Sequence, residues 1–178
     1  MNPIATLLDR MHAADLWEKE ITLERNEYLK VKGTIDTNLY FVQSGSLRIF
    51  VIDAEEEHTI RFGYQNNLIA ALDSFLNGKP SEFYIQALKK TVVKSVTKEN
   101  YTNFIESSVE MKQLWLAILE NFVLQQMERE RDILTSSPLE RYQRVLQRSP
   151  QLFQEIPNKY IASYLRMTPE TLSRIKKS

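Results

Sequence analysis

The 178-residue sequence contains no cysteine, only two histidines and only four glycines. Without cysteine there is no disulfide, thiolate nucleophile, cysteine-ligated zinc site or iron–sulfur cluster. His12 and His58 stand in no metal-ligand or nucleophile spacing, and four glycines leave little material for loops that cradle phosphate. We therefore expect neither an enzyme nor a metal site, and we predict no cofactor.

Long apolar runs are also missing. No stretch approaches the length of a membrane span, and the first ten residues show no signal-peptide pattern. We therefore expect a cytoplasmic protein that does not use a membrane as partner. With 43% hydrophobic residues, the chain can bury one good core and a small satellite domain.

The net charge is zero, because 23 bases balance 23 acids, but the charges are unevenly distributed. Residues 139–178 hold eight bases and three acids and so carry +5, which leaves −5 on the rest of the chain. A basic terminal module on an acidic body suits the phosphate backbone of a nucleic acid. A solvated helical surface is the alternative explanation.

Short β-type runs separated by turn residues occupy the segment from Ile21 to about Val96. We predict a hairpin around Gly45, with further strands at 59–63, 83–88 and 91–96. Residues 67–77 predict a short helix that ends at Gly78-Lys79-Pro80. Closely spaced strands without long helices between them favour an antiparallel sandwich, barrel or roll. A helix precedes them, and four residues form its apolar face: Ile4, Leu7, Leu8 and Met11.

From Ser107 to Leu134 apolar residues recur every three or four positions, and glycine and proline are absent. This pattern predicts a helix of roughly 25 residues, which is long for a globular protein. Its apolar stripe is wide enough to contact both its own domain and a second copy of the chain. We therefore predict a C2 homodimer through this helix, with Ile118 and Phe122 facing the partner. A helix buried within its own domain is the alternative.

The C-terminal segment carries three signals for the start of a helix. Ser137-Pro138, Ser149-Pro150 and Thr168-Pro169 each combine a capping side chain with a proline suited to the first turn. Within this segment, residues 160–175 predict two short helices that cross at a turn formed by Arg166-Met167. Ala162 supplies the small contact between them. Five residues form their shared apolar core: Ile161, Leu165, Met167, Leu172 and Ile175.

The second of these helices presents polar side chains that can reach base edges and phosphates. An arginine can bind guanine through two hydrogen bonds, and a glutamate can accept one from cytosine. The alternative is a generic three-helix packing unit. Six residues are the candidates for DNA binding: Thr168, Glu170, Thr171, Ser173, Arg174 and Lys177.

The run from Glu170 to Arg174 resembles the recognition-helix motif of the Crp/Fnr family of bacterial transcription regulators, the relatives of catabolite activator protein. Residues 137–146 look like the helix that opens that family's DNA-binding domain, and residues 39–52 are similar to the first strands of its β-roll. The resemblance implies an α+β fold in three parts. These are an N-terminal cyclic-nucleotide-binding-like antiparallel β-roll at 1–106, a long dimerisation helix at 107–135, and an all-α helix-turn-helix domain at 136–178.

The same resemblance implies a function and partners. The chain would bind double-stranded DNA as a homodimer on a palindromic site, with RNA polymerase as a further candidate partner. Three features depart from the family. Pro169 stands where arginine is frequent, and the β-wing that usually follows is missing. Arg166 replaces a common turn glycine, which implies strain or altered geometry of about 1 kcal/mol. The alternative function is therefore a ligand-sensing or protein-interaction module whose DNA-binding role is weakened or lost.

The nucleotide cassette departs from the family as well. In the matching stretch, 67–85, alanines and a leucine replace the expected glycine and glutamate, and no arginine is present for the phosphate. Burying an unpaired phosphate costs several kcal/mol, so we do not expect cyclic AMP to bind. An unknown small-molecule effector and a pocket filled by its own side chains both stay open. Six residues are the candidates for ligand binding: Ala71, Leu72, Ser81, Glu82, Phe83 and Gln126.

Overall fold

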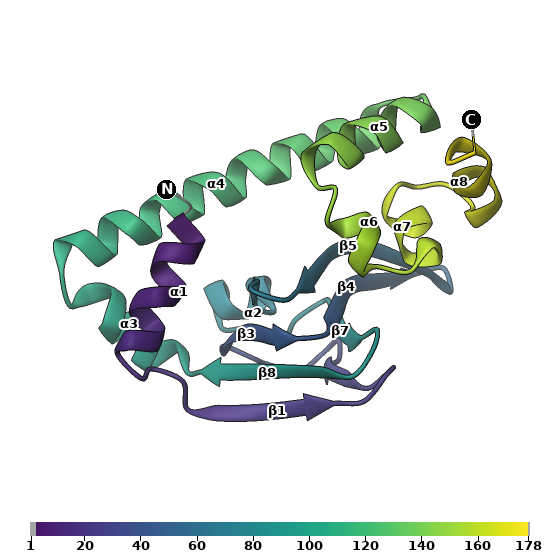
Figure 1. Cartoon of the computed structure of the whole chain (residues 1–178). Coiled ribbons are helices and arrows are strands. Elements are labelled where there is room, and N and C mark those ends of the chain that lie inside the picture. The colour runs from purple at the N-terminus through teal and green to yellow at the C-terminus, as the bar shows by residue number, and fades with distance from the viewer. Residues whose placement is uncertain (1–2, 178) are drawn as a thin grey trace.

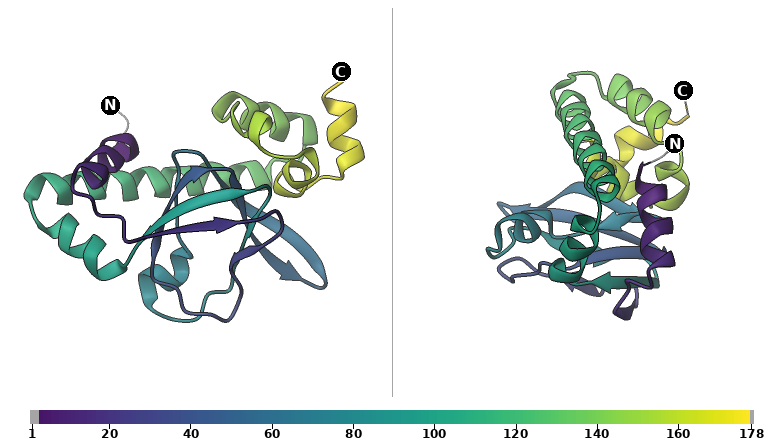
Figure 2. Two further views of the ribbon diagram at one scale, coloured as in Figure 1. Left: turned by 60° about the horizontal axis from the view of Figure 1, so that its bottom comes forward. Right: turned by 90° about the vertical axis from the view of Figure 1, so that its left-hand side faces the viewer.

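The structure, a computed structural model, describes residues 3–177, in which a two-sheet β-roll lies against one long helix (Figure 1). Helices α1 (Pro3–Ala13) and α3 (Lys98–Glu106) lie beside the first half of the long helix, α4 (Val109–Leu134). The short helix α2 (Leu72–Asn77) belongs to the roll. The helices that follow α4 in the chain gather near its C-terminal end, as the left view of Figure 2 shows.

Two four-stranded antiparallel sheets form the roll, with strand orders β1-β8-β3-β6 and β2-β7-β4-β5. The eight strands are β1 (Lys19–Leu23), β2 (Tyr28–Lys30), β3 (Leu39–Ser44), β4 (Ser46–Asp53), β5 (Glu56–Tyr64), β6 (Leu68–Ile69), β7 (Tyr84–Ala87) and β8 (Thr91–Val96). Side chains from both sheets fill the core between them, among them the fully buried Val42, Leu47, Ile85 and Val93. The predicted antiparallel β-roll is confirmed.

The hairpin predicted around Gly45 is wrong, because β3 and β4 belong to different sheets. β3 pairs with β6 and β8, whereas β4 pairs with β5 and β7. The chain crosses between the sheets at Gly45, whose φ is +90° and whose Cβ, if present, would lie 2.4 Å from Thr91 Oγ1. The true hairpin joins β4 to β5 through Ala54 and Glu55, both with positive φ, as a type I′ turn requires.

The helix predicted over 67–77 is two elements. Leu68 and Ile69 form the short strand β6 on the edge of the first sheet, and α2 begins only at Leu72. Tertiary pairing with β3 therefore overrides the local helical pattern in the first half of the segment. The predicted stop is confirmed, because Gly78 ends α2 with a φ of +71°.

Helix α4 is the predicted long helix, and the Ser108 hydroxyl caps it by accepting from the Met111 N–H. The prediction that Ile118 faces a partner is wrong, and Phe122 is partly buried in the single chain. Ile118 is 0% exposed in the single chain, and Phe122 packs in the same cluster with Tyr101. A second stripe on the other side of α4 is exposed, and it includes Leu116, Val123 and Met127. Periodicity reveals an apolar face but does not tell which surface that face covers.

The C-terminal helices are α5 (Pro138–Arg148), α6 (Leu152–Glu155), α7 (Asn158–Tyr164) and α8 (Pro169–Ile175). Ser137 and Thr168 cap α5 and α8 as predicted. The third predicted cap is wrong, since Ser149 ends α5 and no side chain caps α6. These helices share one core with Phe62 and Leu88 of the roll, so they pack directly on the sheet that contains β5.

Candidate nucleic-acid interface and sensor pocket

Helices α7 and α8 form the predicted helix-turn-helix. Ile161, Ala162, Leu165 and Leu172 are almost completely buried between them and their neighbours, while Met167 and Ile175 are only partly buried. The Thr168 hydroxyl accepts from the Thr171 N–H at 3.2 Å and so fixes the start of α8. The apolar face of α8 is thereby turned inward, and its polar face is left outside.

The turn between α7 and α8 has a left-handed backbone at the position where a turn glycine is common in the family. Arg166 has a φ of +54°. Its guanidinium lies 3.2 Å from His58 Nδ1 at the start of β5, and the Ser163 hydroxyl contacts the backbone of Glu57 and Thr59. The turn is therefore held against the roll by contacts to one edge strand.

Four of the six DNA-binding candidates lie together. Glu170, Ser173, Arg174 and Lys177 border one shallow surface depression on α8, and all four side chains are exposed. Thr168 and Thr171 are instead engaged in the helix cap, with their hydroxyls 3.2 Å apart. Hydrogen bonds from its own backbone N–H and from the Thr168 hydroxyl lower the pKa of Glu170. This surface therefore offers two cations, one hydroxyl and one ionised carboxylate.

A cavity of about 190 Å³ lies between the roll and α4. Of the six ligand-binding candidates, Leu72, Phe83 and Gln126 line it. The remaining wall is mostly apolar and comes from the sheets, α2 and α4; it includes Leu39, Ile49, Leu68, Phe75, Trp115 and Phe122. This sensor pocket suits an apolar group better than a ribose and a phosphate.

The other three candidates, Ala71, Ser81 and Glu82, do not line the sensor pocket. Ala71 is buried in the core of the roll, and Glu82 points outward to an ion pair with Lys32 at 2.7 Å. Ser81 is buried, and its hydroxyl donates to the Asp73 carboxylate at 2.8 Å.

Asp73 is a residue that the sequence analysis missed. Its carboxylate accepts hydrogen bonds from the Ser81 hydroxyl and from the backbone N–H groups of Ser74 and Glu82. The bond from the Glu82 N–H is 2.9 Å long. A loop that would offer hydroxyl and N–H donors to a bound phosphate is thus already occupied by an anion of the protein itself. An acid in the first turn of a short helix was the available sequence signal.

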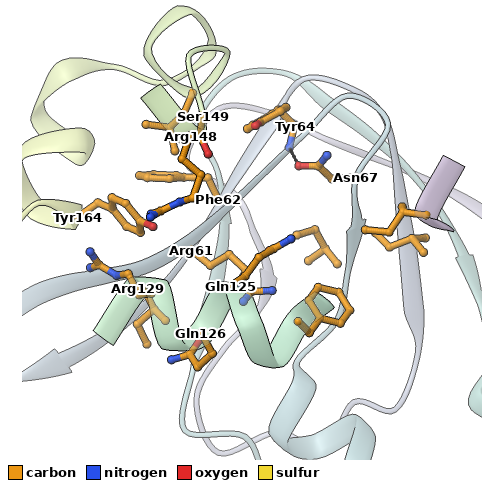
Figure 3. Close-up of a pocket in the computed structure, with 16 residues that line it drawn as sticks. Arg61, Phe62, Tyr64, Asn67, Gln125, Gln126, Arg129, Arg148, Ser149 and Tyr164 are labelled. Atoms are coloured by element: carbon orange, nitrogen blue, oxygen red, sulfur yellow. Dashed lines mark hydrogen bonds between the residues drawn. The ribbon is translucent and has the colours of Figure 1, made fainter. Parts of the chain in front are cut away.

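A second pocket, of about 320 Å³, adjoins the first where β5 and α4 meet α5, α6 and α7 (Figure 3). It shares Arg61, Phe122 and Gln126 with the sensor pocket. Among its polar lining residues, Gln126 is one of the six candidates for ligand binding predicted from the sequence. Arg61 and Arg129 are not among those candidates.

Two kinds of site are not found in the part of the chain that the structure describes. Residues 3–177 contain no group of three or more His, Asp or Glu side chains placed to hold a metal ion. None of the helices described there combines the length and the apolar character needed to cross a membrane.

Comparisons with known proteins agree with this architecture. The family model for the cyclic nucleotide-binding domain matches residues 20–108. A CooA mutant from Carboxydothermus hydrogenoformans superposes with a TM-score of 0.76 at 14% identity, over 96% of this chain and 82% of that one. FixK2 from Bradyrhizobium japonicum gives 0.73 at 17% identity, over 89% and 82%. Thermus thermophilus catabolite activator protein gives 0.61 at 20% identity, over 99% and 85%.

These solved structures share the fold of the Crp/Fnr regulators, and at such identities the likeness concerns the fold alone. Among curated proteins, none matches this sequence.

Proposed function

The chain belongs to the cyclic nucleotide-binding domain family, and on that premise we propose that it is a DNA-binding transcription regulator of the Crp/Fnr type. The observation that carries this proposal is the exposed polar face of α8. Glu170, Ser173, Arg174 and Lys177 lie side by side there, while Leu172 anchors the opposite face. A short helix that presents such side chains fits the major groove. As a regulator it would act in the cytoplasm, without catalysis.

We further propose that the protein works as a C2 homodimer through α4. Leu116, Val123 and Met127 are 56–61% exposed and follow one another at spacings of seven and four residues. Such spacing places them on one stripe of the helix, which a parallel second copy can cover. Soluble proteins rarely leave a contiguous apolar stripe uncovered. Two-fold symmetry would place the two α8 helices about 34–36 Å apart, on successive major grooves of a palindromic site.

We also propose that cyclic AMP is not the effector of this protein. Asp73 occupies the donors that a phosphate would need, and a second anion there would meet like-charge repulsion. Titration calorimetry with cyclic AMP and cyclic GMP tests this. We expect no heat of binding at micromolar nucleotide, and micromolar binding that is lost in Ser81→Ala would overturn it.

The central experiment is a selection of bound sequences from random duplex DNA, followed by a mobility shift of the enriched sequence in excess competitor DNA. We expect a palindromic site with half-sites one helical turn apart. The DNA upstream of the protein's own gene is a natural second probe. If no sequence is enriched even at low salt, the DNA-binding proposal is wrong.

That outcome would favour the alternative function, a ligand-sensing or protein-interaction module. One observation supports it: α7 packs on β5, where Tyr164 lies against Phe62 and Ser163 bonds to the strand backbone. The helix-turn-helix thus contributes to the core of the sensor, which would give it a structural use without DNA.

A further inference from the structure

The second pocket has an unbalanced charge. Three arginines line it, Arg61 from β5, Arg129 from α4 and Arg148 from α5, and its described lining contains no acidic residue. Its other polar groups include Tyr64, Asn67, Gln125, Gln126, Ser149 and Tyr164, as Figure 3 shows. The pocket is therefore cationic and rich in hydrogen-bonding groups.

The three arginines differ in how far their charge is compensated. Arg148 forms ion pairs with Asp132 and Glu128. Arg129 is buried and lies 3.7 Å from the centre of the Tyr164 ring, with one long hydrogen bond of 3.5 Å to the Thr59 carbonyl. The Arg61 guanidinium has no hydrogen bond or ion pair within residues 3–177, and it lies 5.2 Å from the centre of the Phe122 ring. Neither the Arg61 nor the Arg129 guanidinium thus forms an ion pair within residues 3–177, although the Asp132 carboxylate acts on Arg129 from a longer distance.

Removing these guanidinium groups from water costs free energy unless an anion binds to them. Burial lowers the pKa of Arg61 and of Arg129, because removal from water disfavours the charged form. Charged side chains are seldom buried without a partner. Arg61 is partly buried, and its contact with an aromatic ring compensates only part of its lost hydration. A carboxylate, sulfonate or phosphate would supply acceptors for the planar guanidinium.

The adjoining sensor pocket indicates that the rest of the ligand is apolar. Phe75, Phe83 and Trp115 form its apolar wall, and Arg61, Phe122 and Gln126 belong to both pockets. One molecule can therefore place an apolar body beside the aromatic rings and a negative group beside the arginines. The anionic end lies away from the loop where Asp73 already holds Ser81.

We propose that Arg61 and Arg129 bind the anionic group of an amphipathic organic acid whose ring or acyl body fills the sensor pocket. This deepens the proposed function by naming the chemical class of its effector, although the binding itself needs no DNA. Ser149, Leu152 and Tyr164 of the C-terminal helices line the same pocket. A bound acid would therefore touch both the sensor and the helix-turn-helix.

The experiment compares two fluorescent probes that share an apolar body. The full chain is titrated with 8-anilinonaphthalene-1-sulfonate and with N-phenyl-1-naphthylamine, which lacks the sulfonate. We expect the wild type to bind the sulfonate at least about tenfold more tightly. Arg61→Gln should lower the affinity for the sulfonate about tenfold and leave that for the uncharged probe unchanged. The matched control is Arg25→Gln, an exposed arginine of the roll, which should change neither affinity.

Two results would overturn the proposal. One is equal binding of both probes, which would indicate adsorption to the exposed stripe of α4. The other is sulfonate binding that Arg61→Gln leaves intact.

Thermal unfolding without ligand separates a binding role from a structural one. Because the Arg61 guanidinium forms no hydrogen bond or ion pair within residues 3–177, Arg61→Gln should leave Tm unchanged or raise it, whereas a structural arginine would lower Tm when removed. Octanoate should displace the sulfonate probe and octanol should not. None of these readouts contains DNA, so a failed mobility shift would leave this result standing, and absence of probe binding would leave the DNA proposal standing.

Discussion

The guanidinium of Arg141 in α5 donates to the carbonyl oxygen of Arg166, 3.2 Å away in the left-handed turn between α7 and α8. The same group donates to the Leu165 carbonyl at 2.9 Å and to the Thr135 carbonyl at 2.6 Å, just after α4. One side chain therefore joins the end of the long helix to the turn that orients α8.

Replacing Arg141 should loosen that connection. We expect Arg141→Met to lower the free energy of unfolding by about 2 kcal/mol, because several charge-assisted hydrogen bonds to carbonyls are lost while the side-chain stem is kept. Urea unfolding followed by circular dichroism measures it. Arg174→Met, at an exposed arginine of α8, is the control and should change stability by less than about 0.5 kcal/mol. Equal effects in the two variants would contradict the role assigned to Arg141.

A charge placed on the exposed stripe of α4 should break the proposed dimer. Val123→Glu would bury a carboxylate between two helices, so we expect the dimer Kd to rise about a hundredfold or more. Sedimentation velocity at micromolar protein measures it. Asn121→Glu introduces the same residue at an exposed position roughly 160° around the helix and should leave the dimer intact. A wild-type protein that sediments as a monomer would refute the dimer outright.

The two cations of α8 should contribute differently to DNA binding. Arg174→Ala should cost about 1–3 kcal/mol on the selected site and relax its sequence preference, because a base contact with two hydrogen bonds is lost. Lys177→Ala should weaken binding to all DNA sequences alike. It should also reduce the slope of log K against log salt concentration by about one, as expected for a phosphate contact. Lys79→Ala, at an exposed lysine remote in sequence, serves as control. If both α8 variants lower the affinity for all DNA sequences equally, Arg174 does not read bases.

Stability should fall in acid through Glu18. Its carboxylate accepts from the Thr97 N–H at 2.9 Å, from the Thr97 hydroxyl and from the Asn100 amide, and these hydrogen bonds lower the pKa of Glu18. A carboxyl whose pKa is lowered by folding stabilises the fold above its ordinary value, and that contribution disappears as pH falls through the lowered pKa. The stability difference between wild type and Glu18→Gln should therefore shrink below about pH 4.5. A difference that does not change with pH would contradict this.

Local chemistry in the sequence was enough to predict the elements but not all of their neighbours. The Ser137 and Thr168 caps depend on residues close in sequence, and both were predicted correctly. Gly45 was correctly taken as a turn, but a turn signal does not tell which sheet the next strand joins. Ile118 was correctly placed on the apolar face of α4, but the roll, and not a second copy, covers it.

The candidate site was predictable to a similar extent. The polar surface of α8 follows from helical spacing, so four of its residues could be named beforehand. The sensor pocket could not be defined in this way, because Asp73 meets Ser81 only when the loop after α2 folds back. Arg61 and Arg129 acquire their significance from a pocket whose described lining holds no acidic residue, and sequence spacing carries no sign of that.

Strand β1 lies beside β8 in the first sheet, with Lys19 opposite Ser95. During translation β1 therefore leaves the ribosome long before its neighbour β8 has been synthesised. It can pair with β8 only after residue 96 has left the exit tunnel. The β4–β5 hairpin can pair as soon as it emerges, because only Ala54 and Glu55 separate its strands. Translation thus imposes an order on assembly, hairpin first and closing strand last, and the unclosed roll exposes apolar sheet edges to chaperones in the interval.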